Sequence, residues 1–280
     1  MAITVSLINM KGGVGKSTVT VNLAWHFAAY ENWLKRVLVI DLDPQFNASQ
    51  YLVGVREYQQ ILDSNTPTVW NIFEQGTRTP AGMIPRVSAD DAIINVKKIR
   101  GGGKIDLIAS RLELSLTLKN PGNKEKHLSK IVSEIEDNYD LILIDCAPTE
   151  SILTTAAYLC SDYILVPVKP EYLSSIGLPL LVGSMSDFLS ENNDRKLELA
   201  GVVFNAAENY TPEESLSKNS VRDIAQENNW YVFQNEVPYS RSFPKGAREG
   251  KPIFRTSYSR FNKIQQFNKV AWEFAEKIGL

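Results

Sequence analysis

One glycine-rich turn limits what this chain can fold into more than any other feature. The turn spans Lys11–Thr18 and follows a short apolar run, Ile3–Ile8. Gly12, Gly13 and Gly15 can adopt positive φ, and they leave no Cβ between the backbone and a bound anion. A strand, a glycine-rich turn and a helix in that order direct backbone N–H groups and a helix N-terminus toward one phosphate. The sequence therefore predicts a phosphate-binding loop for a nucleoside triphosphate.

The side chains of the turn add chemistry to this backbone cradle. Lys16 can reach the β- and γ-phosphate oxygens, and the Ser17 hydroxyl can serve as a ligand of Mg²⁺. The usual pattern has a glycine six residues before the lysine, but this chain has Met10 there and a second lysine, Lys11, directly after it. The residues predicted to bind the nucleotide here are Lys11, Gly12, Gly13, Val14, Gly15, Lys16, Ser17 and Thr18.

Two later apolar runs end in carboxylates. The run that begins at Arg36 ends at Asp41 and Asp43, and the run that begins at Tyr139 ends at Asp145. In a parallel sheet these carboxylates meet at the carboxyl edge, where ligands bind. The strand period of two places Asp41 and Asp43 on one side of the backbone, so we expect both to face the phosphates. Asp145 fits a Walker B aspartate, which holds Mg²⁺ through water.

Lys11 at the start of the loop, the segment Asp41–Gln45 and the Asp145 strand together resemble the ParA/Soj/MinD family of deviant Walker A ATPases, and ParA-type partition ATPases most of all. The resemblance implies that Lys11 crosses the interface of an ATP-sandwich dimer to touch the partner's nucleotide. It also implies that Asp43 positions or activates the attacking water and that Asp41 lies near Mg²⁺. Catalysis would then depend on Lys11, Lys16 and Asp43. The alternatives are a solvated turn lysine at Lys11 and plain strand-end carboxylates at Asp41 and Asp43.

The base side of the site is implied by the same resemblance. Asn205 closes an apolar run that begins at Leu199, and in the family this asparagine hydrogen-bonds adenine. A side-chain amide, which carries a donor and an acceptor, suits that task. The family segment that matches Pro238 approaches the base. A turn asparagine is the competing interpretation of Asn205.

The order of predicted elements indicates a doubly wound, mostly parallel sheet with helices on both faces, formed by residues 1–280 as one P-loop ATPase domain. The region 46–103 reads as short helices and surface loops with a strand edge at 92–96. Strands are expected at 3–9, 36–43, 105–109, 139–145, 162–168 and 199–205, and helices at 16–30, 68–73, 111–118, 128–136 and 260–278. A basic polar segment, 119–127, is expected to be a solvated linker, with a partner or nucleic-acid contact as the alternative.

A local excess of positive charge lies near the C-terminus. The chain has a net charge of −2, so any nucleic-acid surface must be a confined patch. Between Arg241 and Lys263, seven basic residues stand against Glu249 alone, a local charge of +6, interleaved with aromatic residues such as Phe243 and Tyr258. This pattern is typical of phosphate-backbone binding, and a solvated basic loop is the alternative. The predicted DNA-binding residues are Arg241, Lys245, Arg248, Lys251 and Arg255.

The resemblance completes a functional hypothesis. It implies a Mg²⁺-dependent ATPase that forms a homodimer on ATP binding, binds DNA non-specifically, and is stimulated by a ParB-like or other adaptor protein to segregate or position cargo. We expect no helix-turn-helix domain ahead of the phosphate loop, so that any DNA binding is non-specific, and we expect the protein to be cytoplasmic and nucleoid-associated.

Two alternatives have their own signals. A MinD-like membrane switch would use the final segment, 260–278, whose apolar stripe more readily suits core packing, since Glu273 and Glu276 dilute its cationic face. A cluster-carrying reductase would need two suitably placed cysteines, but Cys146 directly follows Asp145 and Cys160 forms no CxxC pair with it.

Overall fold

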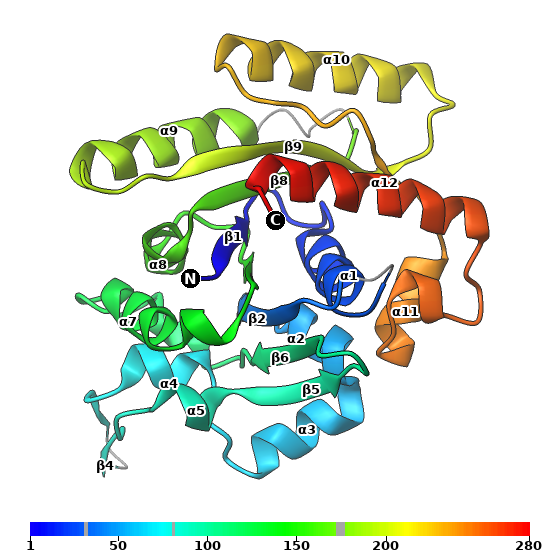
Figure 1. Ribbon diagram of the computed structural model, residues 1–280. Coiled ribbons are helices and arrows are strands. Elements are labelled where there is room, and N and C mark those ends of the chain that lie inside the picture. The colour runs from blue at the N-terminus through cyan, green and yellow to red at the C-terminus, as the bar shows by residue number, and fades with distance from the viewer. Residues whose placement is uncertain (31–32, 80–81, 172–176) are drawn as a thin grey trace.

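The strands that were predicted to end in polar side chains all belong to one central sheet. The computed structural model describes residues 1–30, 33–79, 82–171 and 177–280, and within these ranges eight strands form one sheet in the order β10-β9-β8-β1-β7-β2-β6-β5 (Figure 1). Neighbouring strands are parallel except for the edge pair β5 and β6. The strands are β1 (Ile3–Leu7), β2 (Arg36–Leu42), β5 (Ile94–Lys98), β6 (Lys104–Ile108), β7 (Leu141–Cys146), β8 (Tyr163–Val168), β9 (Glu198–Ala207) and β10 (Val237–Pro238). The predicted doubly wound, mostly parallel sheet is confirmed.

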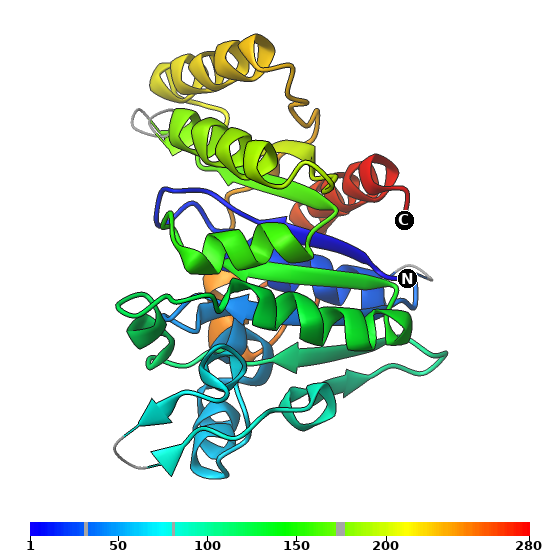
Figure 2. The same ribbon diagram turned by 90° about the vertical axis from the view of Figure 1, so that its left-hand side faces the viewer.

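Helices cover both faces of the sheet, as Figures 1 and 2 show. On one face lie α4 (Val69–Glu74), α7 (Glu125–Ile135), α8 (Ile152–Cys160) and α9 (Gly177–Glu191); on the other lie α1 (Lys16–Ala29), α2 (Asn47–Val53), α11 (Ser242–Glu249) and α12 (Phe261–Ile278). Each face of the sheet forms its own hydrophobic core with the helices that cover it. Because side chains alternate along a strand, Ile142 and Ile144 of β7 face the first set of helices, and Leu141 and Leu143 face the second.

The region 46–103 has the short elements that were expected of it. They are α2, α3 (Val55–Asp63), α4, a two-residue-per-strand hairpin of β3 (Arg78–Thr79) and β4 (Gly82–Met83), α5 (Ala89–Ala92) and β5. The edge strand lies two residues later than the predicted 92–96. The first strand ends at Leu7, because the Asn9 side chain bonds the Pro167 carbonyl and the Lys11 N–H and so begins the loop.

The predicted bounds of two helices, 111–118 and 128–136, were wrong. The helix expected at 111–118 is only α6 (Leu114–Thr117), since the residues before it form tight i→i+3 turns from Arg111 onward. The expected linker 119–127 is partly helix, because α7 begins at Glu125. Its Lys124 is not solvated: the ammonium lies 2.8 Å from both carboxylate oxygens of the buried Glu74. A buried carboxylate needs such a partner, and the partner lies 50 positions away in sequence.

Among the described helices, four have no counterpart among the predicted elements. They are α8, α9, α10 (Pro212–Glu227) and α11. The start of α10 could have been read from the sequence, because Thr211 caps it through a bond from the Glu214 N–H and Pro212 stands at its first position.

The final helix packs into the core, as its apolar stripe indicated. Phe267, Val270, Ala271 and Phe274 of α12 are buried against α1 and the sheet. Glu273 was expected on the exposed cationic face, and that was wrong. Its carboxylate is buried and accepts bonds from the Tyr231 hydroxyl, the Gln234 and Asn235 N–H groups and the Asn235 side chain. The charge therefore ties α12 to the connection before β10.

A buried histidine makes the stability of this core depend on pH. His26 of α1 is fully buried among aromatic rings, and burial lowers its pKa from 6.5 to about 4, offset only in part by the Asn268 side chain. The unfolded chain therefore binds a proton between these values and the folded chain does not, so stability is complete above the unfolded pKa and is lost as pH falls toward 4.

We predict that His26→Gln removes this dependence. Relative to the variant, the wild-type free energy of unfolding should fall by about 2 kcal/mol between about pH 7.5 and about pH 5, measured by urea denaturation. A difference between the two proteins that is constant with pH would contradict the buried neutral histidine.

Candidate functional site

The phosphate loop lies between β1 and α1 and opens on a cavity of about 360 Å³. Gly13 and Gly15 have φ of 76° and 90°, and Gly15 directly precedes the first residue of α1. The first turn of α1 has no acidic residue, so no carboxylate there opposes the attraction of an anion to the N–H groups and the positive end of the helix dipole. The cavity is lined by Gly12, Gly13, Gly15, Lys16, Ser17, Thr18, Asp43, Asn47, Tyr51, Pro148 and Ala247.

Lys16 is held at the floor of this cavity. Its ammonium donates to the Asn9 carbonyl at 3.0 Å and to the Lys11 carbonyl at 3.3 Å. Burial lowers the pKa of Lys16, and the nearby charges of Asp145 and Asp43 act in the opposite direction. A buried ammonium with carboxylates close by and an anion-binding loop above it is suited to contact phosphate oxygens.

Asp145 and Asp41 lie side by side in register on β7 and β2, and both are fully buried. Burial raises the pKa of Asp145 well above its usual range, and the charge of Asp41 adds to the effect, while Ser17 and Lys16 oppose it. Its Oδ1 accepts a bond from the Thr20 hydroxyl at 3.3 Å. Its Oδ2 is buried with no hydrogen-bond partner among the described residues. An unpartnered buried carboxylate oxygen near a serine hydroxyl fits a Mg²⁺ site, since Mg²⁺ takes few protein ligands and keeps waters.

Asp41 differs from Asp145 in having both oxygens bonded. Oδ2 accepts from the Ser49 N–H at 2.8 Å and the Ser49 hydroxyl at 2.7 Å, and Oδ1 accepts from the Asp43 N–H at 3.1 Å. Burial raises the pKa of Asp41 to about 7, although the bonds from Ser49 lower it. Asp41 therefore fixes the turn from β2 into α2 at its present geometry.

Asp43 is the carboxylate of this turn that lines the cavity. It is buried, and its Oδ1 accepts the Gln45 N–H at 2.9 Å. Of the two carboxylates expected to face the phosphates, Asp43 lines the cavity, whereas Asp41 turns its oxygens to Ser49 and the backbone. The alternation of strand side chains no longer applies at Asp43, which lies one residue beyond the end of β2.

Two positioning residues were missed in the sequence. Ser49 binds Asp41 and also accepts the Ser110 N–H at 3.0 Å, so it joins α2 to the end of β6. The Thr20 hydroxyl lies within hydrogen-bond distance of both the Lys16 carbonyl and the Asp145 carboxylate, so it connects the first turn of α1 to the end of β7. Thr20 lies one helical turn after Lys16, which is a signal that sequence reasoning could have used; the partner of Ser49 could not be identified without the fold.

Lys11 reaches across the loop toward β8. Its ammonium lies 3.5 Å from Glu171 Oε2, and Lys169 pairs with the same carboxylate. The Lys11 side chain is 26% exposed, so the contact lies at the surface. Surface pairs of this kind contribute little to stability and can exchange partners.

Asn205 and the phosphate loop are in direct contact. The Asn205 side-chain amide donates to the Val14 carbonyl at 2.7 Å, although the two residues are 191 positions apart. A Cβ on Gly15 would lie 2.0 Å from Asn205 Nδ2. Pro238 lies at the neighbouring strand end, since β10 pairs with β9 and places Val237 opposite Asn205 and Pro238 opposite Ala207. The structure thus brings Asn205 to the loop and Pro238 close behind it.

The basic segment borders the same cavity through α11. Ala247 lines the cavity, and the Tyr51 hydroxyl lies 3.4 Å from the Phe243 carbonyl. Arg241, Arg248, Lys251 and Arg255 are exposed, and Lys245 is half-buried. Glu249 contacts Lys245 and Lys251, whereas Arg241 and Arg248 have no ion pair within the described ranges. Phe243 was expected among the surface aromatics and is instead buried in the core, while Tyr258 is exposed.

The remaining features concern other kinds of site. Cys146 is buried in β7, and burial raises its thiol pKa; Cys160 lies at the end of α8. No cluster of three or more metal-binding side chains occurs in the part of the chain that the structure describes. Among the described helices, none is long and apolar enough to cross a membrane.

Comparison with known proteins gives a consistent result. Residues 2–199 match the family model described as an AAA domain. An uncharacterized protein of Methanocaldococcus jannaschii is 30% identical over 90% of this chain and 91% of its own length. The chromosome-partitioning ATPase Soj of Treponema pallidum is 28% identical over 100% of this chain and 99% of its own. The structure of a Cyanothece McdA variant in complex with ATP has the same fold, with a TM-score of 0.78, 16% identity, and coverage of 100% of this chain and 97% of that one.

We predict that Gly15→Ala destabilises the protein far more than Gly13→Ala. Both positions have positive φ, so each variant should lose about 1–2 kcal/mol from backbone strain. The Gly15 variant adds a clash with Asn205, whereas nothing lies within 4 Å of a Cβ on Gly13. Urea denaturation should show this extra loss, and equal losses in the two variants would contradict the contact between Asn205 and the loop.

Proposed function

Because the chain belongs to the ParA/Soj family of AAA-domain partition ATPases, we propose that it is a Mg²⁺-dependent ATPase that forms an ATP-sandwich dimer and positions cargo on DNA. The observation that carries the proposal is the phosphate loop with Lys16 on its floor, facing Asp43 and Asp145 at adjacent strand ends. Residues 1–280 would act as one domain, and ATP would lie between the loop and the Asn205–Pro238 side of the sheet.

Each residue of the site has a proposed task in hydrolysis. Lys16 binds the β- and γ-phosphate oxygens, together with the loop N–H groups from Lys11 to Thr18. Ser17 and Asp145 hold Mg²⁺, and Asp41 supports them from the adjacent strand. Mg²⁺, when bound, neutralises charge on the phosphates. Asp43 orients the attacking water from the cavity wall. Catalysis of this kind consists of positioning and charge stabilisation.

Lys11 is proposed to act on the partner's nucleotide. In the single chain its ammonium is paired with Glu171 at the surface. A phosphate group of the partner's nucleotide carries more charge than a carboxylate, so it can replace Glu171 as the partner of Lys11. A lysine supplied in trans would then stabilise the transferred phosphoryl group as an arginine finger does.

The basic segment is proposed to bind the DNA backbone when ATP is bound. Its helix α11 shares the cavity wall with the phosphate loop through Ala247, and the Ile253 N–H donates to the side chain of Asn22 on α1. Changes at the nucleotide can therefore reach α11 through direct contacts. An adaptor protein of the ParB type would stimulate hydrolysis and so end DNA binding, in a cytoplasmic, nucleoid-associated cycle.

The alternatives are less well supported. A MinD-like membrane switch would need the apolar stripe of the final helix, and in this structure that stripe packs against α1 and the sheet. A reductase would need paired cysteines at a shared face, whereas Cys146 is buried inside β7.

We predict that Lys16→Ala and Asp43→Ala each lower the rate of phosphate release by about 100-fold or more. Asp43→Ala should leave ATP affinity nearly unchanged, because Asp43 acts on water, while Lys16→Ala should weaken it. Glu150→Ala, an exposed carboxylate beyond the end of β7, provides a control with unchanged rate. Unchanged phosphate release in both site variants would refute the assignment.

A second prediction concerns DNA. Binding to a random-sequence duplex should occur with ATP but not with ADP or without nucleotide, weaken steeply with salt, and be lost in Lys11→Ala. Arg241→Ala and Arg248→Ala should each lower the salt slope by about 1. Glu249→Gln should strengthen binding, because it releases Lys245 and Lys251 from their ion pairs.

The matched control for this series is Arg195→Ala, an exposed arginine before β9 and far from α11 in sequence. Filter binding or fluorescence anisotropy over a salt series measures the slope. Absence of binding in every nucleotide state would exclude the DNA proposal, and vesicle binding would then be the next measurement.

A further inference from the structure

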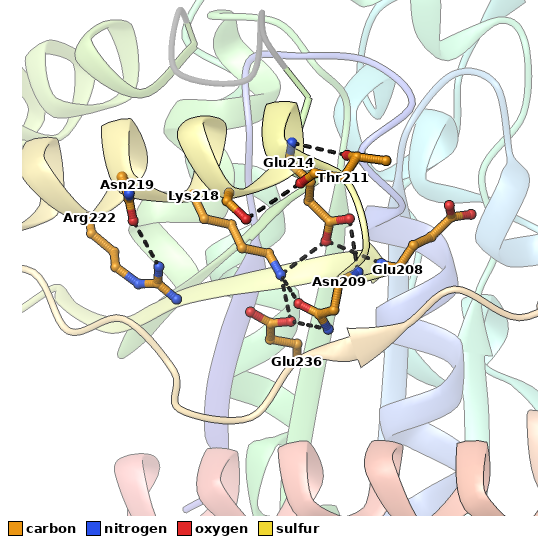
Figure 3. A network of polar contacts seen from close by, with 9 residues as sticks. Glu208, Asn209, Thr211, Glu214, Lys218, Asn219, Arg222 and Glu236 are labelled. Atoms are coloured by element: carbon orange, nitrogen blue, oxygen red, sulfur yellow. Dashed lines mark hydrogen bonds and ion pairs between the residues drawn. The ribbon is translucent and has the colours of Figure 1, made fainter.

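The ammonium group of Lys218 is buried next to the turn that follows β9, the strand that contains Asn205. Lys218 of α10 is 5% exposed, and its ammonium lies 3.0 Å from Glu214 Oε1 and 2.8 Å from Glu236 Oε2 (Figure 3). It also donates to the Asn209 side-chain carbonyl, and it lies 5.5 Å from the centre of the Phe204 ring. Lysine is seldom buried to this degree unless it is paired, so the surroundings of Lys218 form a built polar site.

The carboxylates paired with Lys218 hold the backbone of the turn. Glu214 accepts the N–H groups of Glu208 at 3.1 Å and Asn209 at 2.9 Å. The end of β9 and the turn after it each contain a non-glycine residue with positive φ, Ala206 at 55° and Asn209 at 64°. Such a conformation is costly and persists only where surrounding contacts determine it. The Lys218 pair with Glu214 supplies those contacts.

The same ammonium joins two segments that are far apart in sequence. Glu236 directly precedes Val237–Pro238, and its carboxylate also accepts the Asn209 side-chain N–H at 3.0 Å. The two strand ends pair with a register shift between Val237 and Pro238, which places Val237 opposite Asn205 and Pro238 opposite Ala207. Figure 3 shows Asn209 from the turn and Glu236 from the β10 side meeting at Lys218. Lys218 thus fixes Asn205 and Pro238 relative to each other.

We propose that Lys218 is a positioning residue for the nucleobase: it locks the turn after Asn205 to the strand that carries Pro238, and so sets the affinity for the base without touching it. The inference rests on the proposed function, in which Asn205 and Pro238 border the base. The phosphate loop itself has no bond to Lys218, Glu214 or Glu236 in the described structure, and its link to this turn is the single bond from Asn205 to the Val14 carbonyl, so the phosphate side of the site should depend on this cation far less than the base side does.

The test measures the contribution of the base to binding separately from the contribution of the phosphates. Lys218→Met keeps an unbranched side chain as far as Cε and removes the ammonium group. Binding is measured by calorimetry with two probes, ATP and inorganic tripolyphosphate, each with Mg²⁺. We expect the Kd for ATP to rise about tenfold, the loss of roughly one well-placed hydrogen bond, while the Kd for tripolyphosphate stays within about twofold. The preference for ATP over GTP should fall as well.

Two further variants make the result decisive. Lys196→Met, an exposed lysine before β9, is the control and should bind both probes as wild type does. Glu236→Gln removes the charge from the link to the β10 side and leaves the Lys218–Glu214 pair, so it should weaken ATP binding in the same direction but less. If Lys218→Met fails to fold, as judged by circular dichroism, Glu236→Gln decides the question.

Equal weakening of both probes, or unchanged ATP binding in Lys218→Met and Glu236→Gln, would overturn the positioning role. Wild-type protein that binds tripolyphosphate but not ATP would instead overturn the proposed base site. Failure of the wild type to bind either probe would overturn the ATPase proposal itself, so the three failures are distinct.

Discussion

Two buried carboxylates set the requirements for the rest of this structure. Asp41 and Asp145 lie opposite each other on adjacent parallel strands with no exposure to solvent, and burial raises the pKa of both. Burying like charges together is costly unless cations or hydrogen bonds compensate. The chain compensates one through the two bonds from Ser49 and places the ammonium of Lys16 near the other. The remaining unpartnered oxygen, Asp145 Oδ2, is a reason for the site to take a divalent cation.

The elements around these carboxylates are connected to one another by side chains as well as by backbone. Asn22 of α1 donates to the Tyr51 hydroxyl at 3.0 Å and accepts the Ile253 N–H at 2.8 Å, so one buried amide joins the phosphate-loop helix, α2 and the basic segment. Gly246 of α11 has no room for a side chain, because a Cβ there would lie 2.4 Å from the Lys251 carbonyl and 2.8 Å from the Tyr51 hydroxyl. The basic segment is therefore seated tightly on the nucleotide side of the molecule.

Charged residues in this protein divide into two groups with different roles. Lys124, Lys218 and Glu273 are buried or nearly so and hold segments together, whereas Arg241 and Arg248 point their charge into solvent. Sequence composition does not separate the groups, because an ion pair across 50 positions and a solvated lysine have the same local pattern. That is why the segment 119–127 was expected to be a linker and why Glu273 was assigned to an exposed face.

The sequence by itself determined the sheet, the phosphate loop and the strand ends at which the carboxylates lie. Apolar runs, glycines and strand-end aspartates are local signals, and they predict strand ends and loop chemistry because each depends only on its immediate neighbours. The tertiary structure alone decided which oxygens of Asp41 are bonded, that Asn205 touches Val14, and that Lys218 joins β9 to β10. These contacts join residues far apart along the chain, and a buried polar group takes whichever partner the packing brings within reach.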